Sequence, residues 1–116
     1  MAIREIVQHT DNFIRMKSRA VKYIDEHIEE NFTIQSICEE FHYSKTFITD
    51  VFKRHMRCPL MKYIKQKKII YAHNLILAGE KKHLAAKRVG FKDYSTFYRQ
   101  YKSLITLPVK KTNKNL

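Results

Sequence analysis

Residues 90–102 carry side chains that are suited to contact with nucleic acid. Phe97 and Tyr101 lie one helical turn apart, so they share a face and can anchor a helix to a core. Hydroxyl groups and cations fall on the other faces, at Tyr94, Tyr98, Arg99 and Lys102. Such groups can hydrogen-bond to base edges and to phosphates. An ordinary amphipathic helix with a basic surface shows the same pattern, so this segment alone leaves both interpretations open.

The helix in this segment is bounded by recognisable signals. Gly90 suits the end of a short helix expected over residues 81–88, and Asp93 with Ser95 can cap the helix that follows. The segment therefore predicts two helices joined by a turn, which is the helix-turn-helix pattern.

The same pattern occurs earlier in the chain. Thr33 can cap one helix and Ser44 the next, with His42 and Tyr43 in the turn between them. Helical spacing gives both helices a buried face, made by Ile34, Ile37, Cys38 and Phe41 and then by Phe47, Ile48, Val51 and Phe52. One offset relates Ile48 to Phe97, Phe52-Lys53 to Tyr101-Lys102 and Pro59 to Pro108, which indicates an internal repeat.

Two further helices are predicted. The longest runs over residues 60–78, with Pro59 favouring its start and Gly79 its end. Its inward positions are Leu60, Tyr63, Ile64, Ala72, Leu75 and Ile76. The other begins at a Thr10-Asp11 cap and extends to about Glu30. Its apolar residues are Phe13, Ile14, Val21, Ile24 and Ile28, with Tyr23 beside them.

These elements predict an all-α fold in which two helix-turn-helix subdomains, homeodomain-like and in tandem, are joined by a long connecting helix. Only two glycines and two prolines occur, which is too few for an all-β fold with many tight turns. The expected parts are an N-terminal helix or linker (1–17), a first subdomain (18–59), the connecting helix (60–78), a second subdomain (79–109) and a basic tail (110–116).

Charge points to an anionic partner. The chain carries 23 Lys and Arg against 11 Asp and Glu, a net charge of +12, with local density at residues 62–68 and 110–114. No apolar run approaches the length of a membrane span, and charged residues throughout the first 20 positions argue against a secretory signal. Cys38 and Cys58 are too few for a disulfide framework and are typical of reduced thiols in an intracellular protein.

The ordering resembles the DNA-binding domain of the AraC/XylS family of bacterial transcription regulators. The resemblance covers roughly residues 18–110 and is densest in Val89-Gly90-Phe91-x-Asp93-x-Ser95-x-Phe97-x-Arg99-x-Tyr101-Lys102. The first copy carries it as Ser44-x-x-Phe47-Ile48-x-x-Val51-Phe52-Lys53-Arg54, and the connecting helix as Tyr63-Ile64-x-x-x-Lys68-Ile69-x-x-Ala72-x-x-Leu75-Ile76. The chain departs from the family pattern at the glycine after each recognition helix, where it has Arg57 and Thr106. Lys82 replaces a buried aliphatic residue, Ala85 replaces a branched one, and Asp50 replaces a basic or amide residue.

The recognition helices would read bases with the exposed residues of their N-terminal halves. In the first copy these are Lys45, Thr46, Thr49 and Asp50, and in the second they are Tyr94, Ser95, Tyr98 and Arg99. Arg99 is the best candidate for a bidentate guanine contact. Asp50 can accept from cytosine N4, or it can be a surface charge paired with Lys53 or Arg54.

Other residues would meet the DNA backbone. Lys53, Arg54 and Lys102 lie further along their helices and are expected to contact phosphates, while the helix ends at Thr33, Ser44 and Leu60 offer amide groups to phosphates. The connecting helix would hold the two reading helices about one DNA turn apart, roughly 34 Å.

The resemblance implies a bacterial, cytoplasmic, nucleoid-associated regulator of transcription, more often an activator. Its partners would be double-stranded DNA and RNA polymerase, with no membrane and no cofactor. A stand-alone chain of this kind would bind as a monomer. The chain is either such a regulator or the DNA-binding part of a longer protein.

The sequence leaves three other interpretations to compare. Cys38, His42, His55 and Cys58 have the residue types and approximate spacing of a zinc site, although a cysteine on a buried stripe is often a small apolar residue. An enzyme is disfavoured, because neither a Gly-rich phosphate loop nor a nucleophile–base pair can be recognised. The remaining alternative is a basic helical module that binds an acidic protein, an anionic membrane surface or DNA without sequence preference.

Overall fold

The computed structural model describes residues 3–114, with side chains placed for residues 11–105. These residues form six α-helices and one π-helical turn, and none of them is in a strand. The elements are α1 (Ile3–Glu26), α2 (Ile34–Phe41), α3 (Lys45–Val51), η1 (Phe52–Met56), α4 (Leu60–Leu77), α5 (Lys82–Arg88) and α6 (Tyr94–Lys114). The predicted all-α class, with two helix-turn-helix pairs joined by a long helix, is confirmed.

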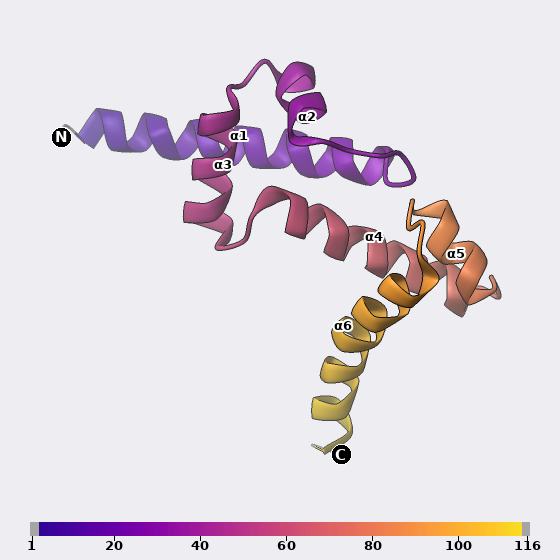
Figure 1. Cartoon of the computed structure of the whole chain (residues 1–116). Helices are drawn as coiled ribbons and strands as arrows, with labels where there is room; N and C mark the ends of the chain where they lie inside the picture. Colours follow the sequence, from indigo (N-terminus) through magenta and orange to yellow (C-terminus); the bar gives the residue numbers. More distant parts are fainter. Residues whose placement is uncertain (1–2, 115–116) are drawn as a thin grey trace.

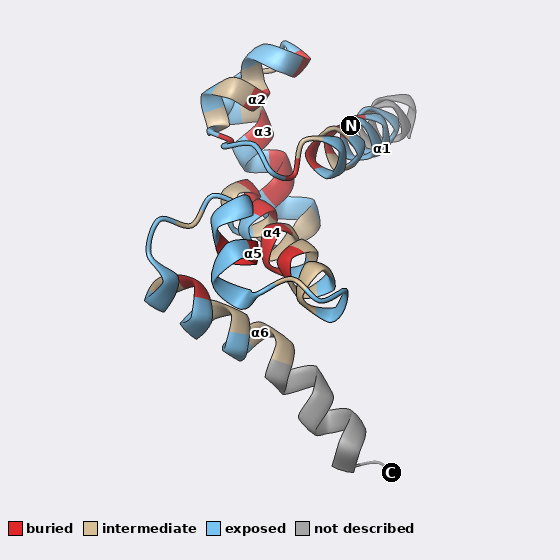
Figure 2. Ribbon diagram, turned by 90° about the vertical axis from the view of Figure 1, so that its right-hand side faces the viewer, coloured by how far each residue is buried: buried red, intermediate tan, exposed pale blue. Residues whose placement is uncertain are grey.

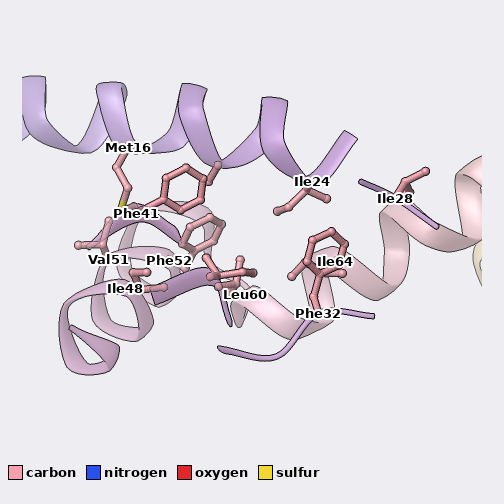
Figure 3. Close-up of a cluster of buried hydrophobic side chains, with 12 residues drawn as sticks. Met16, Ile24, Ile28, Phe32, Phe41, Ile48, Val51, Phe52, Leu60 and Ile64 are labelled. Atoms are coloured by element: carbon pink, nitrogen blue, oxygen red, sulfur yellow. The ribbon is translucent and has the colours of Figure 1, made fainter. Parts of the chain in front are cut away.

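The two helix pairs lie at opposite ends of α4 (Figure 1). Helices α1, α2 and α3 gather around its N-terminal end, and α5 and α6 lie around its C-terminal end. Each end has its own core. The first holds Met16, Ala20, Ile24, Ile28, Phe32, Ile37, Phe41, Ile48, Val51, Phe52, Leu60 and Ile64 (Figure 3). The second holds Ile69, Ala72, Ala85, Ala86, Val89 and Phe97. Since α4 contributes to both cores, it is the shared structural element of the molecule.

The start predicted for the first long helix is wrong. Thr10 and Asp11 do not cap a helix, because α1 continues through them from Ile3 to Glu26. Neither residue breaks a helix as proline does, and no glycine precedes them, so the backbone can continue. The helix also stops before Glu30, which instead donates its N–H to the carbonyl of His27 in a turn.

The face of α1 differs from the predicted one by a small rotation. Ile14 was expected to be buried and is 53% exposed, while Met16 and Ala20 are each only 2% exposed. Met16, Ala20 and Ile24 recur every fourth residue, which defines the stripe against the first core. Met16 belongs to the segment expected to be an N-terminal helix or linker, yet it packs in this core.

Both predicted caps of the first motif are present. The Thr33 hydroxyl accepts from the N–H of Ser36 at 2.9 Å, and the Ser36 hydroxyl accepts from the N–H of Thr33 at 3.0 Å, which makes a reciprocal capping box. The Ser44 hydroxyl accepts from the N–H of Phe47 at 3.1 Å and begins α3. These bonds satisfy amides that the helices themselves leave free.

Glycines end the two helices α4 and α5. Gly79 follows α4 with φ +109° and Gly90 follows α5 with φ +92°, both in the left-handed region. Glu80 donates to the carbonyl of Leu75, and Phe91 to that of Ala86, so both ends are closed by the same hydrogen-bond pattern. Gly79 and Gly90 therefore act as predicted.

A buried lysine was not predicted in α4. Lys68 is 8% exposed, and its ammonium donates to the backbone carbonyls of Ile28 and Glu30, each at 2.6 Å. Burial lowers the pKa of Lys68, and the neighbouring carboxylates of Glu30 and Glu29 oppose that shift. The side chain thus satisfies carbonyls that follow α1 and ties that turn to α4.

Glu29 joins the two ends of the molecule. Its carboxylate accepts from the Tyr71 hydroxyl of α4 at 2.6 Å and from Arg88 Nη2 of α5 at 3.1 Å. The Tyr71 hydrogen bond, followed by that of Arg88, lowers the pKa of Glu29. Arg88 also pairs with Glu80 at 3.2 Å. We call the group formed by Glu29, Tyr71, Arg88 and Glu80 the polar bridge.

The C-terminal segment extends the last helix. Residues 110–114, expected to be a basic tail, belong to α6, which runs from Tyr94 to Lys114 through Pro108. Met1, Ala2, Asn115 and Leu116 lie outside the described residues. None of the described helices is both long and apolar enough to cross a membrane.

Candidate nucleic-acid interface

Helix α3 has one buried face and one exposed, polar face. Ile48 and Val51 are 2% and 3% exposed and pack in the first core. The opposite side is exposed along the helix and carries the residues expected to read bases, Lys45, Thr46, Thr49 and Asp50. This surface begins at the Ser44 cap, so its first turn presents free backbone amides as well as side chains.

Asp50 is paired with Arg54 one turn along. Arg54 Nη2 lies 3.2 Å from the carboxylate, and the two side chains are 64% and 60% exposed. One of the two interpretations of Asp50, a surface charge with a basic neighbour, is therefore present in the unbound protein. An exposed i,i+4 pair of this kind is worth roughly 0.3–0.5 kcal/mol, so a DNA group could displace either partner.

The turns around α3 use left-handed backbone without glycine. His42, which ends α2, has φ 60°, and Arg57, which ends η1, has φ 55°. Arg57 is the residue that stands where the resembling family has glycine. Lys53 and Arg54, expected to contact phosphates, are exposed on η1, directly after α3.

The second recognition helix begins at an aspartate cap. The carboxylate of Asp93 accepts from the Thr96 hydroxyl at 2.7 Å and from the Ser95 N–H at 3.1 Å. These hydrogen bonds, that of Thr96 first, lower the pKa of Asp93. Asp93 is therefore the capping side chain, and Ser95 contributes its amide.

Aromatic packing holds α6 in place, as its spacing predicted. Phe97 is fully buried, and its ring meets those of Phe91 at 5.2 Å and Tyr101 at 5.4 Å between centroids. The hydroxyl of Tyr101 shares a hydrogen bond of 2.9 Å with His73 Nδ1 of α4. The free side of α6 is thus set by contacts to both α4 and the turn before it.

The free side of α6 presents every residue of this helix that is expected to contact DNA. Tyr94 and Tyr98 are 41% and 39% exposed, and their rings stack with centroids 6.0 Å apart. Ser95, Arg99 and Lys102 are also exposed. In Figure 2 the first turns of α6 alternate between exposed residues, in pale blue, and buried or intermediate ones, as expected of a helix with one exposed side.

Three cations that were not predicted from the sequence lie beside this surface. Lys82 of α5 places its ammonium 5.6 Å from the centre of the Tyr98 ring, within the range of a cation–π contact. Lys62 and Lys65 of α4 line a groove with Arg99. The unusual lysine at position 82 and the charge density at residues 62–68 were signals, but only the packing of α4, α5 and α6 shows which lysines face the recognition helix.

The zinc interpretation gains no support. Cys38 packs against the first core, and the Cys58 thiol donates to the Pro59 carbonyl at 3.4 Å. The His55 ring stacks on Phe13, with centroids 4.2 Å apart. Within residues 11–105, no three His, Cys, Asp or Glu side chains are grouped so that they could hold a metal ion.

Two helix-turn-helix pairs with exposed recognition helices, held on one shared helix, define a double helix-turn-helix protein. A family model described as a helix-turn-helix domain matches residues 37–115. The chain belongs to this family of helix-turn-helix domains. The family is of the AraC/XylS type, whose members are the DNA-binding domains of transcription regulators. The resemblance stated from the sequence is thereby confirmed.

Solved structures share the fold. The chain is similar to the C-terminal domain of the two-component response regulator YesN from Fusobacterium nucleatum, at 25% identity and a TM-score of 0.70, over 80% of this chain and 98% of that one. It is also similar to the C-terminal domain of AraT, a response regulator from Geobacillus stearothermophilus, at 21% identity, a TM-score of 0.69 and coverages of 79% and 78%. A protein of unknown function from Listeria innocua gives 23% identity, a TM-score of 0.67 and coverages of 77% and 86%. Comparison with curated proteins gives no significant match.

Proposed function

We propose that this chain recognises a specific duplex DNA sequence by placing α3 and α6 in two successive major-groove segments on one face of the DNA. The observation that carries the proposal is the division of each helix into two sides. The buried side completes a core, and the free side exposes all eight residues expected to read bases. This is what a helix needs in order to enter a groove without losing its support.

The two reading surfaces have different chemistry. Thr46 and Thr49 offer methyl and hydroxyl groups to thymine and to base edges, while Lys45 and Asp50 provide charge of either sign. On α6, Arg99 would contact guanine, and the stacked pair of Tyr94 and Tyr98 would present flat apolar surface with hydroxyl tips. Ser95 adds a small hydroxyl at the start of that helix.

Contacts with the backbone would fix the register. Lys53, Arg54 and Lys102 are exposed further along the two helices and would meet phosphates, together with the helix starts at Thr33 and Ser44. Such contacts add affinity without sequence information. The family supports a regulator of bacterial transcription, acting in the cytoplasm at the nucleoid as an activator that contacts RNA polymerase. A chain with both recognition helices needs no second copy to read two boxes.

The test is selection of bound duplexes from a random pool of about 30 base pairs, which is long enough for two boxes one turn apart. We expect two enriched boxes with centres roughly one turn apart. Arg99→Ala should lose the preference within one box and keep the other, since each bidentate contact carries about 1–3 kcal/mol of discrimination.

Arg15→Ala is the matched control, because Arg15 is exposed on α1, outside both helix-turn-helix pairs. It removes the same charge and should leave both boxes intact. Binding without any enriched sequence would contradict the proposal and favour a basic module for an acidic protein, an anionic membrane or DNA in general.

A further inference from the structure

A groove between α4 and α6 includes Arg99, but its other lining residues have no role in the function proposed above. It encloses about 740 Å³, and Lys62 and Lys65 of α4 face Arg99 and Ser103 of α6 across it. Its apolar lining comes from Ile69, which belongs to the second core, and from the half-buried Leu104. Packing of α4 against α6 therefore fixes the walls of the groove.

The charge of this groove has one sign. Lys62, Lys65 and Arg99 are all exposed, and no carboxylate is among the described lining residues. In the part of the chain that the structure describes, neither Lys62 nor Lys65 forms an ion pair, whereas the nearby Lys67 is 3.1 Å from Asp25. Three cations on the walls of one groove, with no carboxylate among its described lining residues, favour an anionic ligand.

We propose that this groove binds the phosphodiester backbone of DNA at the crossing between the two major-groove segments. The inference rests on the proposed function. Two successive major-groove segments on one face of a duplex are separated by a minor groove and the phosphate strands that border it. The part of the protein between the two reading helices has to face these strands.

The position of the lysines matches that requirement. Lys62 and Lys65 lie in the first turns of α4, directly after α3 and η1 in the chain, and they face Arg99 on the other recognition helix. In Figure 1, α3 lies at the N-terminal end of α4 and α6 begins near its other end. A groove that joins the first turns of α4 to Arg99 of α6 therefore lies between the two reading helices, and it shares Arg99 with the reading surface of α6. Lys62 and Lys65 would meet phosphates while Arg99 reads a base edge, and Ser103 would donate a hydroxyl.

The experiment measures how the affinity for a fixed duplex depends on salt. Each phosphate contact contributes about −0.9 to the slope of log K against log salt concentration. If Lys62→Ala/Lys65→Ala removes two contacts, the loss of affinity between 50 and 200 mM salt should become about tenfold smaller. The bases selected should not change. Lys62→Arg/Lys65→Arg should keep the wild-type slope.

Arg15→Ala/Lys22→Ala is the control, because it removes two exposed charges from α1. Equal slopes for the control and for Lys62→Ala/Lys65→Ala would overturn the proposal. Thermal unfolding of each variant establishes that it is folded.

Failure of the proposed function gives a different pattern. In one case the wild-type protein selects no sequence, but Lys62→Ala/Lys65→Ala still lowers the salt dependence and the control does not. The groove would then be a site for the DNA backbone, and the proposal of base reading would be rejected. In the other case the protein selects two boxes, but replacing Lys62 and Lys65 does not change the slope of log K against log salt concentration. Base reading would then be retained, and the groove would be rejected as a site for the DNA backbone.

Discussion

Arg57 occupies backbone geometry that most L-residues avoid. Its φ of 55° ends η1, at the position where the resembling family has glycine. A left-handed conformation costs a residue with a Cβ roughly 1–2 kcal/mol, and glycine recovers part of this while making the unfolded chain more flexible. We expect Arg57→Gly to raise the free energy of unfolding by about 1 kcal/mol, measured by urea denaturation.

Lys53→Gly is the matched comparison for Arg57→Gly. Lys53 is also exposed, but its backbone is helical, so glycine there should lower stability by about 1 kcal/mol. If both replacements changed stability in the same direction, the conformation of residue 57 would not be the deciding factor.

Asp93 sets the start of the second recognition helix. Because its carboxylate accepts from Thr96 and Ser95, Asp93→Ala should fray the first turn of α6, where Tyr94 and Ser95 lie. We expect a lower melting temperature and weaker DNA binding, whereas Asp93→Asn should keep most of both, since asparagine also caps helices. Thermal denaturation and duplex binding measure the two effects. Equal losses in Asp93→Ala and Asp93→Asn would show that charge, rather than capping, matters.

The helices themselves could largely be predicted from sequence. Caps at Thr33 and Ser44 and the glycines at 79 and 90 are local signals, and local hydrogen bonds decide where these helices begin and end. The start of α1 was missed because Asp11 favours a cap, yet neither Thr10 nor Asp11 prevents a helix from continuing through it. The predicted buried face of α1 was rotated from the observed one because apolar residues occur on two sides of the helix. Only the packing of α1 against the first core determines that Met16, and not Ile14, is buried.

Contacts between elements were the part that sequence could not supply. Lys68 looks like one more surface lysine, and its burial follows from two backbone carbonyls that the turn after α1 brings to α4. The position of the groove lysines could not be predicted for the same reason, because it is the crossing of α4 and α6 that places Lys62 and Lys65 opposite Arg99. The exposed side of each recognition helix, by contrast, followed from helical spacing alone.

The polar bridge links the helices of one unit to those of the other. Glu29 follows α1, and its partners Tyr71 and Arg88 lie on α4 and α5. We expect Glu29→Gln and Arg88→Gln each to lower the urea midpoint, and the double variant to lose less than the sum of the two, because both remove one shared interaction.

The pH dependence gives a second readout of the same bridge. The pKa of Glu29 is lowered in the folded protein, so its stabilising effect is present above the unfolded pKa and is lost as pH falls through the folded value. The coupling between the two substitutions should therefore be full at pH 7 and be lost as the pH falls through the folded pKa of Glu29, which lies below the ordinary glutamate value. Coupling that persisted after protonation would assign the effect to packing. The pair of Asp50 and Arg54 within one recognition segment serves as a control that links no separate units.

At the scale of the molecule, α4 determines how the two reading surfaces are spaced. Both cores include residues of this one continuous helix, so its length and direction set the distance and orientation between α3 and α6. We expect that inserting about 5 base pairs between the two selected boxes reduces the affinity to that of a single box, because half a turn moves one box to the far side of the duplex.

An insertion of about 10 base pairs restores the face but doubles the separation, which α4 cannot span. The affinity should therefore stay low, and competition binding with the three duplexes measures this. Recovery at 10 base pairs would indicate that the two units move relative to each other or that two molecules bind.

Each unit closes its own core around its own half of α4. The buried residues of the core that supports α3 are therefore not those of the core that supports α6, and only the partly buried Tyr71 packs against both among the described residues. Replacements of exposed residues on α3 should leave the core under α6 unchanged, so the two proposed reading surfaces can diverge independently over evolutionary time. A duplicated motif with one common helix is for this reason a simple route by which a small protein acquires a new, longer recognition sequence one box at a time.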